Sequence, residues 1–265
     1  MNANSKIRKN LKARITRARK QYESLVISAE NISYADLSFD TYHDPAKGRT
    51  ELHLKLPTVP DEVGILASEC LHHLRSTLNM VLSSAIRSST DDPTKISKPQ
   101  YPIFDTAEKF DKEARKRDLK GANDALVNWV RENQPFSFEG KLADSLSLLN
   151  KLSNSDKHTD LTAIATAMMN PAYIETSSIS PSEDVRSWRV AIPMAVPAFG
   201  YVPTMLMAIE TQPPTARIHF GSPSLLMQYV DISVVFAEAP QFYVGDIDLM
   251  IDDVEIICNS LMDFV

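Results

Sequence analysis

The sequence predicts an α+β fold in one domain, residues 1–265, with a central helical bundle, long N- and C-terminal helices and an antiparallel sheet. Three observations predict it. Apolar residues recur at three- and four-residue steps over much of 61–169, which is typical of helices. Two runs that alternate apolar and polar residues flank the turn sequence DPAKG within 34–56. Runs rich in β-branched and aromatic residues, split by Pro, Gly and Ser, occupy 172–240. We therefore expect an early β-hairpin and late strands to share a sheet.

The two ends of the chain are predicted to be amphipathic helices of opposite charge, over 1–31 and 246–264. The first twenty residues carry eight Lys or Arg and no acid. Removing these charges from the formal net charge of −6 leaves −14 on the remaining 245 residues. The last helix carries six acids and no base. Two interpretations stay open: the basic helix binds nucleic acid or a nucleotide, or it pairs with the acidic helix.

Composition favours a cytoplasmic protein. The two cysteines, Cys70 and Cys258, form neither a metal-ligand spacing nor a disulfide framework. No apolar segment follows the basic N-terminal residues, so we expect no signal peptide. The uncharged run 191–209 contains three prolines, which predicts two buried strands joined by a turn and no membrane span. A homo-oligomer is an open alternative.

The predicted helix over 61–89 separates an apolar face from an unusual polar one. The apolar face holds Cys70, Leu74, Leu78, Val81 and Ala85. The opposite face holds Glu69, His72, His73, Ser76, Asn79 and Ser83, with Arg75 at the border. A carboxylate, two imidazoles and an amide on one face make it the first candidate binding surface.

The segment SNSDKH, 153–158, is the second candidate. Its Ser, Asn and Asp residues are typical helix caps, so it indicates a corner between the helix over 140–153 and a second helix over 157–169. A functional interpretation is also open, because Lys157 could hold a phosphate and His158 could move protons near neutral pH. Asn154 and Asp156 would then orient the ligand.

The two candidates predict one pocket if the polar helix face meets the SNSDKH corner. Glu69 and His73 are spaced one helical turn apart, as metal ligands can be, but the sequence offers no third ligand. We therefore predict no metal and no cofactor. No glycine-rich phosphate loop, G-x-S-x-G elbow or His-Glu-x-x-His motif occurs in the chain.

Four short motifs occur in a fixed order: ECLHHLRSTLNMVL, YPIF, NQPF and LLNKLSNSDKH. Over about 66–160 the chain resembles a widespread group of uncharacterised bacterial proteins with HLRSALD, FPIF, QPY and LxNxDKHR-like motifs. The resemblance implies no established activity. The chain departs from the pattern at Asn79, where the group usually has Asp, and at Thr159, where it often has Arg.

A more distant analogy is to the HEPN superfamily of helical ribonucleases and nucleotide-binding modules. Their usual signature is an Arg followed four to six residues later by a His, and the region of His158 lacks that spacing. The analogy is one of type, and a shared fold type does not carry function.

Two functions stay open. The first is a binding or interaction module that recognises an anionic ligand, a nucleotide or a partner through the His/Arg/Asn face. The second is a metal-independent ribonuclease, conceivable in a defence or toxin system. Its general acid and base would be His158 or His73, and its phosphate would be stabilised by Arg75 and Lys157.

Overall fold

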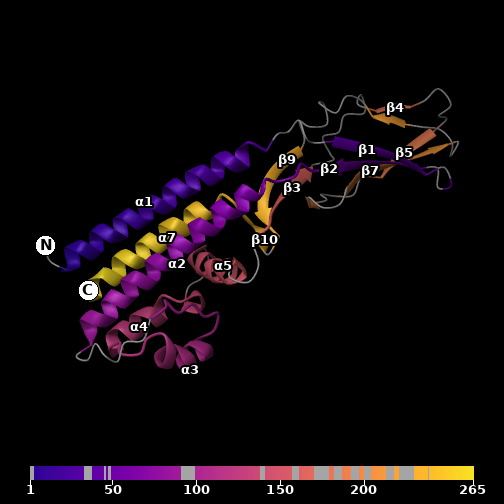
Figure 1. Ribbon diagram of the computed structural model, residues 1–265. Coiled ribbons are helices and arrows are strands. Elements are labelled where there is room, and N and C mark those ends of the chain that lie inside the picture. Colours follow the sequence, from indigo (N-terminus) through magenta and orange to yellow (C-terminus); the bar gives the residue numbers. More distant parts are fainter. Residues whose placement is uncertain are drawn as a thin grey trace. The chain divides into compact units, whose positions relative to one another are not determined.

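The computed structural model describes most of the helical residues and the paired parts of the strands (Figure 1). The described ranges are 3–32, 38–44, 46, 49–90, 99–137, 141–156, 161–169, 179–181, 187–191, 197–199, 204–212, 218–220, 230–237 and 239–265. The chain forms two compact units. One unit contains Met1–Ile27, Asp61–Thr162 and Phe236–Val265, and the other contains Ser28–Pro60 and Ala163–Val235. The expectation of a single domain stays a prediction.

Three long helices form the centre of the helical unit: α1 (Ala3–Glu30), α2 (Asp61–Ser89) and α7 (Asp246–Leu261) (Figure 1). Their apolar faces are buried, and the face predicted for α2 is fully enclosed, with Leu74 and Leu78 both 0% exposed. Arg14 Nη1 donates to Ser76 Oγ at 2.8 Å, and Cys70 Sγ donates to the Ala18 carbonyl at 3.2 Å. From Arg14 to Ala18 the residue number rises on α1, while the number of the bonded residue on α2 falls from Ser76 to Cys70. These two helices are therefore antiparallel.

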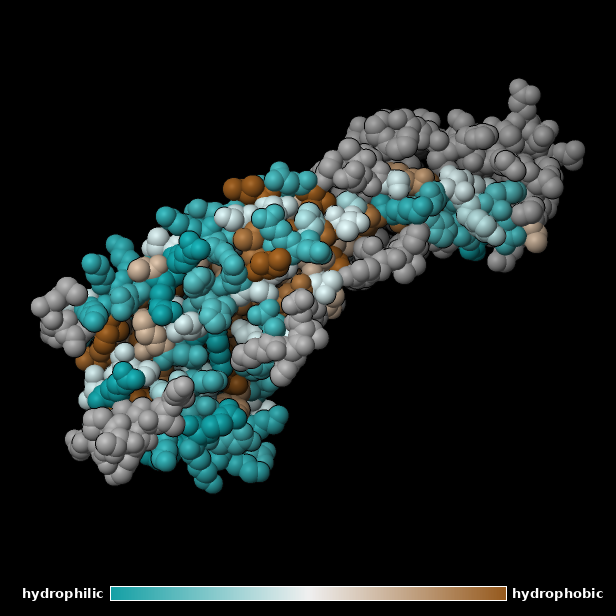
Figure 2. Space-filling view, in the orientation of Figure 1, coloured by the Kyte–Doolittle hydropathy of each residue, from teal (hydrophilic) through white to brown (hydrophobic). Residues whose placement is uncertain are grey.

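The basic first helix and the acidic last helix are joined by an ion-pair cluster. Arg19 on α1 lies 2.7 Å from Asp252, 2.9 Å from Glu255 and 3.6 Å from Asp248, all on α7. The hydrogen bonds that Arg19 donates to Asp252 and Glu255 raise the pKa of Arg19. The predicted pairing of the two helices is confirmed at this residue. Other α1 cations, such as Lys12 and Arg17, are exposed, and hydrophilic residues dominate along α1 in Figure 2.

Shorter helices complete this unit: α3 (Ala107–Arg117), α4 (Asp124–Glu132), the 3-10 turn η3 (Pro135–Ser137) and α5 (Lys141–Asp156). Side chains cap two of them, because Thr106 accepts from Lys109 N and Asn123 accepts from Leu126 N at 2.8 Å. Gly121, with φ of 92°, allows the left-handed turn between α3 and α4. The strand β10 (Ala239–Tyr243) precedes α7, which continues into η6 (Met262–Phe264).

The predicted boundary near residue 153 is wrong. The SNSD residues continue α5 to Asp156, and Ala163–Met169 forms the strand β3, where we expected a helix over 157–169. A short apolar run such as AIATAMM fits a strand as well as a helix, and here antiparallel pairing of Thr166–Met168 with another strand decides. Lys157 to Asp160 lie outside the described residues.

The second unit contains antiparallel sheets. One has the strand order β1-β2-β7-β5, from β1 (Ser38–Asp44), β2 (Arg49–Lys55), β7 (Thr204–Gln212) and β5 (Ser187–Ala191). In a second sheet, β9 (Val230–Phe236), β3 and β6 (Pro197–Phe199) are neighbours in that order. A third pairs β4 (Ile179–Pro181) with β8 (Ile218–Phe220). The pairing of β2 with β7 confirms that the early hairpin and a late strand share a sheet, so the predicted α+β class is correct.

Replacing Arg19 by Met should lower the free energy of unfolding by about 0.5–1 kcal/mol at low salt, because exposed ion pairs contribute little even when several acids share one cation. The loss should shrink at about 1 M NaCl, where surface charges are screened. Denaturant unfolding of the variant measures the effect. The matched control is Lys12→Met on the exposed side of α1, and an equal loss in both variants would contradict the cluster.

Candidate functional site

A pocket of about 320 Å³ brings the polar face of α2 together with α1 and the end of α5. Its lining residues are Arg17, Ser68, Glu69, His72, His73 and Asp156. Four of them come from the first half of α2, one from α1 and one from the last residue of α5. The expected meeting of the α2 face with the SNSDKH segment is therefore present at Asp156.

Hydrogen bonding holds the end of α5 against α2. Ser68 Oγ donates to Asp156 Oδ1 at 2.5 Å, across 88 residues of sequence. Asp156 thus serves a tertiary contact, whereas the sequence suggested that it caps a following helix. A bond between a hydroxyl and an ionised carboxylate is stronger than one between neutral groups, so it orients both side chains in the pocket.

A glycine allows the chain after α5 to approach α2 this closely. A Cβ atom at Gly64 would lie 2.3 Å from the carbonyl oxygen of Leu161, a backbone atom that a rotamer change cannot move. Gly64 lies one turn before Ser68 on α2, so the close approach and the Ser68–Asp156 bond fix the same junction. Glycine was not singled out from the sequence, because its role depends on a neighbour 97 positions away.

The two histidines supply imidazoles in different settings. His72 is exposed and His73 is half-buried, with ring centroids 6.3 Å apart and planes at 66°. Burial is the main cause that lowers the pKa of His73 below its ordinary value. The positive charges of Arg17 and Arg14 add to the lowering, and Glu69 opposes it. The lowered pKa favours the neutral form of His73, which can accept a hydrogen bond or a proton.

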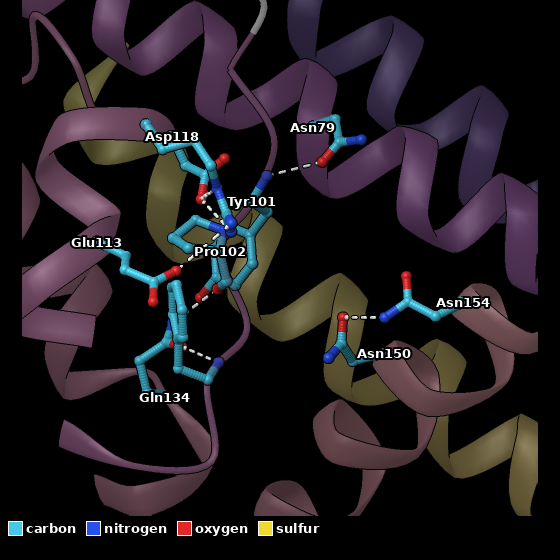
Figure 3. Close-up of polar contacts among 10 residues, drawn as sticks. Asn79, Tyr101, Pro102, Glu113, Asp118, Gln134, Asn150 and Asn154 are labelled. Carbon is cyan, nitrogen blue, oxygen red and sulfur yellow. Dashed lines mark hydrogen bonds and ion pairs between the residues drawn. The ribbon is translucent and has the colours of Figure 1, made fainter. Parts of the chain in front are cut away.

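Arg75 and Asn79, the other predicted α2 residues, do not line this pocket. Asn79 Oδ1 accepts from the backbone N–H of Tyr101 at 2.7 Å (Figure 3). Burial lowers the pKa of Arg75, while Asp118 and Tyr101 oppose that effect. Among the described residues, the buried Nη1 of Arg75 finds no hydrogen-bond partner. Arg75 is not among the described residues that line the pocket of the imidazoles, and the groups that act electrostatically on its pKa are Asp118, Tyr101 and Arg117, so the described structure does not bring Arg75 and the imidazoles together there.

Hydrogen bonds join the YPIF motif to the NQPF motif. The side chain of Gln134, 0% exposed, accepts from Phe104 N at 3.0 Å and donates to the Pro102 carbonyl at 2.9 Å (Figure 3). The Tyr101 hydroxyl donates to the Asn133 carbonyl at 3.2 Å. The segment Tyr101–Phe104, which we call the strap, is thus held between Asn79 of α2 and Gln134 after α4. Because an unpaired buried amide is costly, these bonds account for the strap residues without a catalytic role.

The remaining predicted residues are distributed as follows. Asn154 lies on α5, and its Nδ2 donates to Asn150 Oδ1 at 3.4 Å (Figure 3). Lys157 and His158 lie outside the described residues, so their convergence with His73 stays a prediction. Within the described ranges, no group of three or more His, Cys, Asp or Glu could hold a metal ion.

Sequence reasoning missed two pocket residues, Arg17 and Ser68. Arg17 was one of eight similar cations, and only the packing of α1 against α2 selects it. Ser68 lies at the spacing i, i+4 from His72, which is a signal for the same helix face. It is a weak signal, since many surface serines share a face with a histidine.

Comparison with known proteins finds no matching family model, no matching curated protein and no matching solved structure. The resemblance of the four motifs to an uncharacterised bacterial group therefore stays a prediction. In the part of the chain that the structure describes, no helix is both long and apolar enough to cross a membrane.

Replacing Gly64 by Ala should lower the free energy of unfolding by about 1–3 kcal/mol, because the new Cβ meets the Leu161 carbonyl. The loss should occur although Ala is a better helix former than Gly by about 1 kcal/mol. The control is Gly245→Ala, where a Cβ would meet no atom within 4 Å. Urea unfolding of both variants checks the contrast, and an unchanged midpoint for Gly64→Ala would exclude the close approach.

The stability of the protein should depend on pH through His73. Since the pKa of His73 is lower in the folded state, the unfolded state binds more protons near and below about pH 6.5, and stability falls as the pH drops through that range. His73→Gln removes this contribution, so the loss of stability on acidification should be smaller in the variant. Denaturant unfolding at several pH values gives the comparison. An identical pH dependence in the variant and the natural chain would show that His73 is not perturbed.

Proposed function

We propose that the protein is a binding module and that the pocket between α1, α2 and α5 recognises an anionic, phosphate-bearing ligand. The observation that carries the proposal is the convergence of Arg17 with His72 and His73 on one concave surface. An arginine guanidinium binds phosphate through paired N–H donors, and imidazoles add hydrogen bonds without requiring a charge.

The surroundings of Arg17 extend the positive charge. Arg14, Arg17 and Lys20 follow one another at three-residue steps, so they lie along one side of α1. Arg14 is already oriented by its bond to Ser76, whereas Arg17 and Lys20 are exposed. A polyanion could contact this row while its end enters the pocket, because phosphate contacts need only positive groups spaced along a surface.

The carboxylates of the pocket narrow the ligand class. Asp156 accepts a hydrogen bond from the hydroxyl of Ser68, and the side chain of Glu69 is exposed to solvent. A simple inorganic anion would be repelled by them, whereas a nucleotide presents hydroxyl and amino donors as well as phosphate. The mixed lining therefore favours a nucleotide or the end of a nucleic acid over a free anion.

Cleavage of RNA is the second candidate, and one observation favours it. Burial lowers the pKa of His73, which favours its neutral form, and a neutral imidazole in the same pocket as Arg17 could accept a proton from a ribose hydroxyl. A partner acid is needed to protonate the leaving oxygen, and His158 stays the predicted partner. Binding without cleavage needs fewer groups, which is why we prefer it.

The proposal predicts that Arg17→Gln weakens the binding of adenosine 5′-monophosphate by about 10-fold or more, because a charged hydrogen bond contributes roughly 1.5–3 kcal/mol. The matched control is Lys12→Gln, an exposed α1 cation outside the pocket. Isothermal titration calorimetry at low and high salt measures both. No saturable binding to the natural chain, or equal losses in the two variants, would contradict the proposal.

The same proteins separate binding from cleavage. Incubation with total RNA, with and without a chelator, tests the natural chain beside His73→Ala and His158→Ala. Fragments that form with chelator and disappear in both variants would favour the ribonuclease. Intact RNA, or cleavage that is equal in all three proteins, leaves the binding module as the function of the pocket.

A further inference from the structure

A larger cavity, of about 780 Å³, lies elsewhere in the helical unit, between α5 and the start of α7. It is lined by Asp105, Asp144, Ser145, Ser147, Leu148, Asn150, Lys151, Phe242, Asp246 and Leu249. None of these residues lines the pocket that contains Arg17. Its volume is in the range of cavities that hold small organic ligands, about 300–1,000 Å³.

The lining combines an apolar surface with acidic groups. Leu148 of α5, Phe242 of β10 and Leu249 of α7 supply the apolar part. Leu249 is 41% exposed, although it belongs to a helix whose other leucine, Leu261, is 0% exposed. An apolar side chain exposed at the wall of a cavity gains free energy when a ligand covers it.

Among the described residues, three aspartates and one lysine line the cavity, and these groups have a negative balance at neutral pH. Two of the carboxylates are oriented before any ligand binds. Asp246 Oδ2 accepts from the backbone N–H of Tyr243 at 2.8 Å, and Asp105 Oδ1 accepts from Ser147 Oγ at 3.2 Å. A carboxylate accepts several hydrogen bonds, so each keeps capacity for a donor on a ligand.

An uncharged polar side chain, the amide of Asn150, also lines the cavity. Asn150 Oδ1 accepts from Asn154 at 3.4 Å, which orients the Asn150 side chain along α5 (Figure 3). The carboxylates are too dispersed to act as one inner sphere, since no group of three acids among the described residues could hold a metal ion. Dispersed acceptors around an apolar surface suit an organic cation better than a bare one.

We propose that this cavity binds a small organic monoamine, an ammonium group carried on an apolar body. The ammonium group is held by the aspartates, and the body covers Leu148 and Leu249, whereas Phe242 is already buried beneath the wall. Lys151 disfavours a second ammonium group, so a polyamine fits less well than a monoamine. This site is separate from the pocket that contains Arg17, because the two share no lining residue in the part of the chain that the structure describes.

The test uses 2-phenylethylamine as the probe and phenylacetate as the analogue with the same ring and the opposite charge. We expect saturable binding of the amine by ligand-observed NMR and no binding of the acid. Spermidine, a polyamine, should bind more weakly than the monoamine at equal ionic strength. Comparable binding of the amine and the acid would overturn the proposal, and so would the absence of saturation with the amine.

Variants locate the binding. Asp144→Asn should lower the affinity for 2-phenylethylamine by about 10-fold. Asp144 is exposed, so it can be changed without disturbing the core. Asp246→Asn tests the second carboxylate, with circular dichroism to confirm that α7 is intact. Asp253→Asn, on the same helix but outside the lining, is the control and should leave the affinity unchanged. Equal affinities of Asp144→Asn, Asp246→Asn and the control would exclude this cavity as the site.

Discussion

The junction between α2 and the end of α5 is the constraint on which the candidate site depends. Two features form this junction. Gly64 has no side chain and so leaves room for the Leu161 carbonyl, and Ser68 Oγ donates a hydrogen bond to Asp156 Oδ1 at 2.5 Å. Without this junction, α2 would present its imidazoles on an open helix face. With it, α5 closes one side, and α1 closes another with Arg17. Two residues with little chemistry of their own therefore convert a polar surface into a concave site.

The four motifs serve packing at least as much as chemistry. Asn79 and Gln134, in two different motifs, hold the strap Tyr101–Phe104 by hydrogen bonds to its backbone. An amide can accept from a backbone N–H in a buried place, which a charged side chain does at greater cost. A motif rich in Asn, Gln and Pro thus reflects the need to satisfy the polar groups of a buried irregular segment. Among the described motif residues, those in the first half of α2 and at the end of α5 stay candidates for ligand binding or catalysis.

The long elements were predictable because their signals are local. The helix over 61–89 has the predicted bounds, and its enclosed face is the one that periodicity selected. The boundary after residue 153 was not predictable, since AIATAMM becomes a strand by pairing with its neighbours β9 and β6. Four of the six described residues that line the pocket were candidates from the sequence: Glu69, His72, His73 and Asp156. The roles of Arg17 and Gly64 were not predictable, because they depend on how α1 and the chain after α5 pack against α2. Arg75 lies at the border between the two faces of α2, and periodicity does not decide which face such a side chain joins.

The coupling between Ser68 and Asp156 tests the junction most directly. A double-mutant cycle with Ser68→Ala, Asp156→Asn and the double variant measures it by urea unfolding. We expect a coupling free energy of about 1 kcal/mol or more, because the two side chains share a hydrogen bond to a charged group. Additive effects of the two substitutions would show that α2 and the end of α5 do not meet, and the pocket would then lose its third wall.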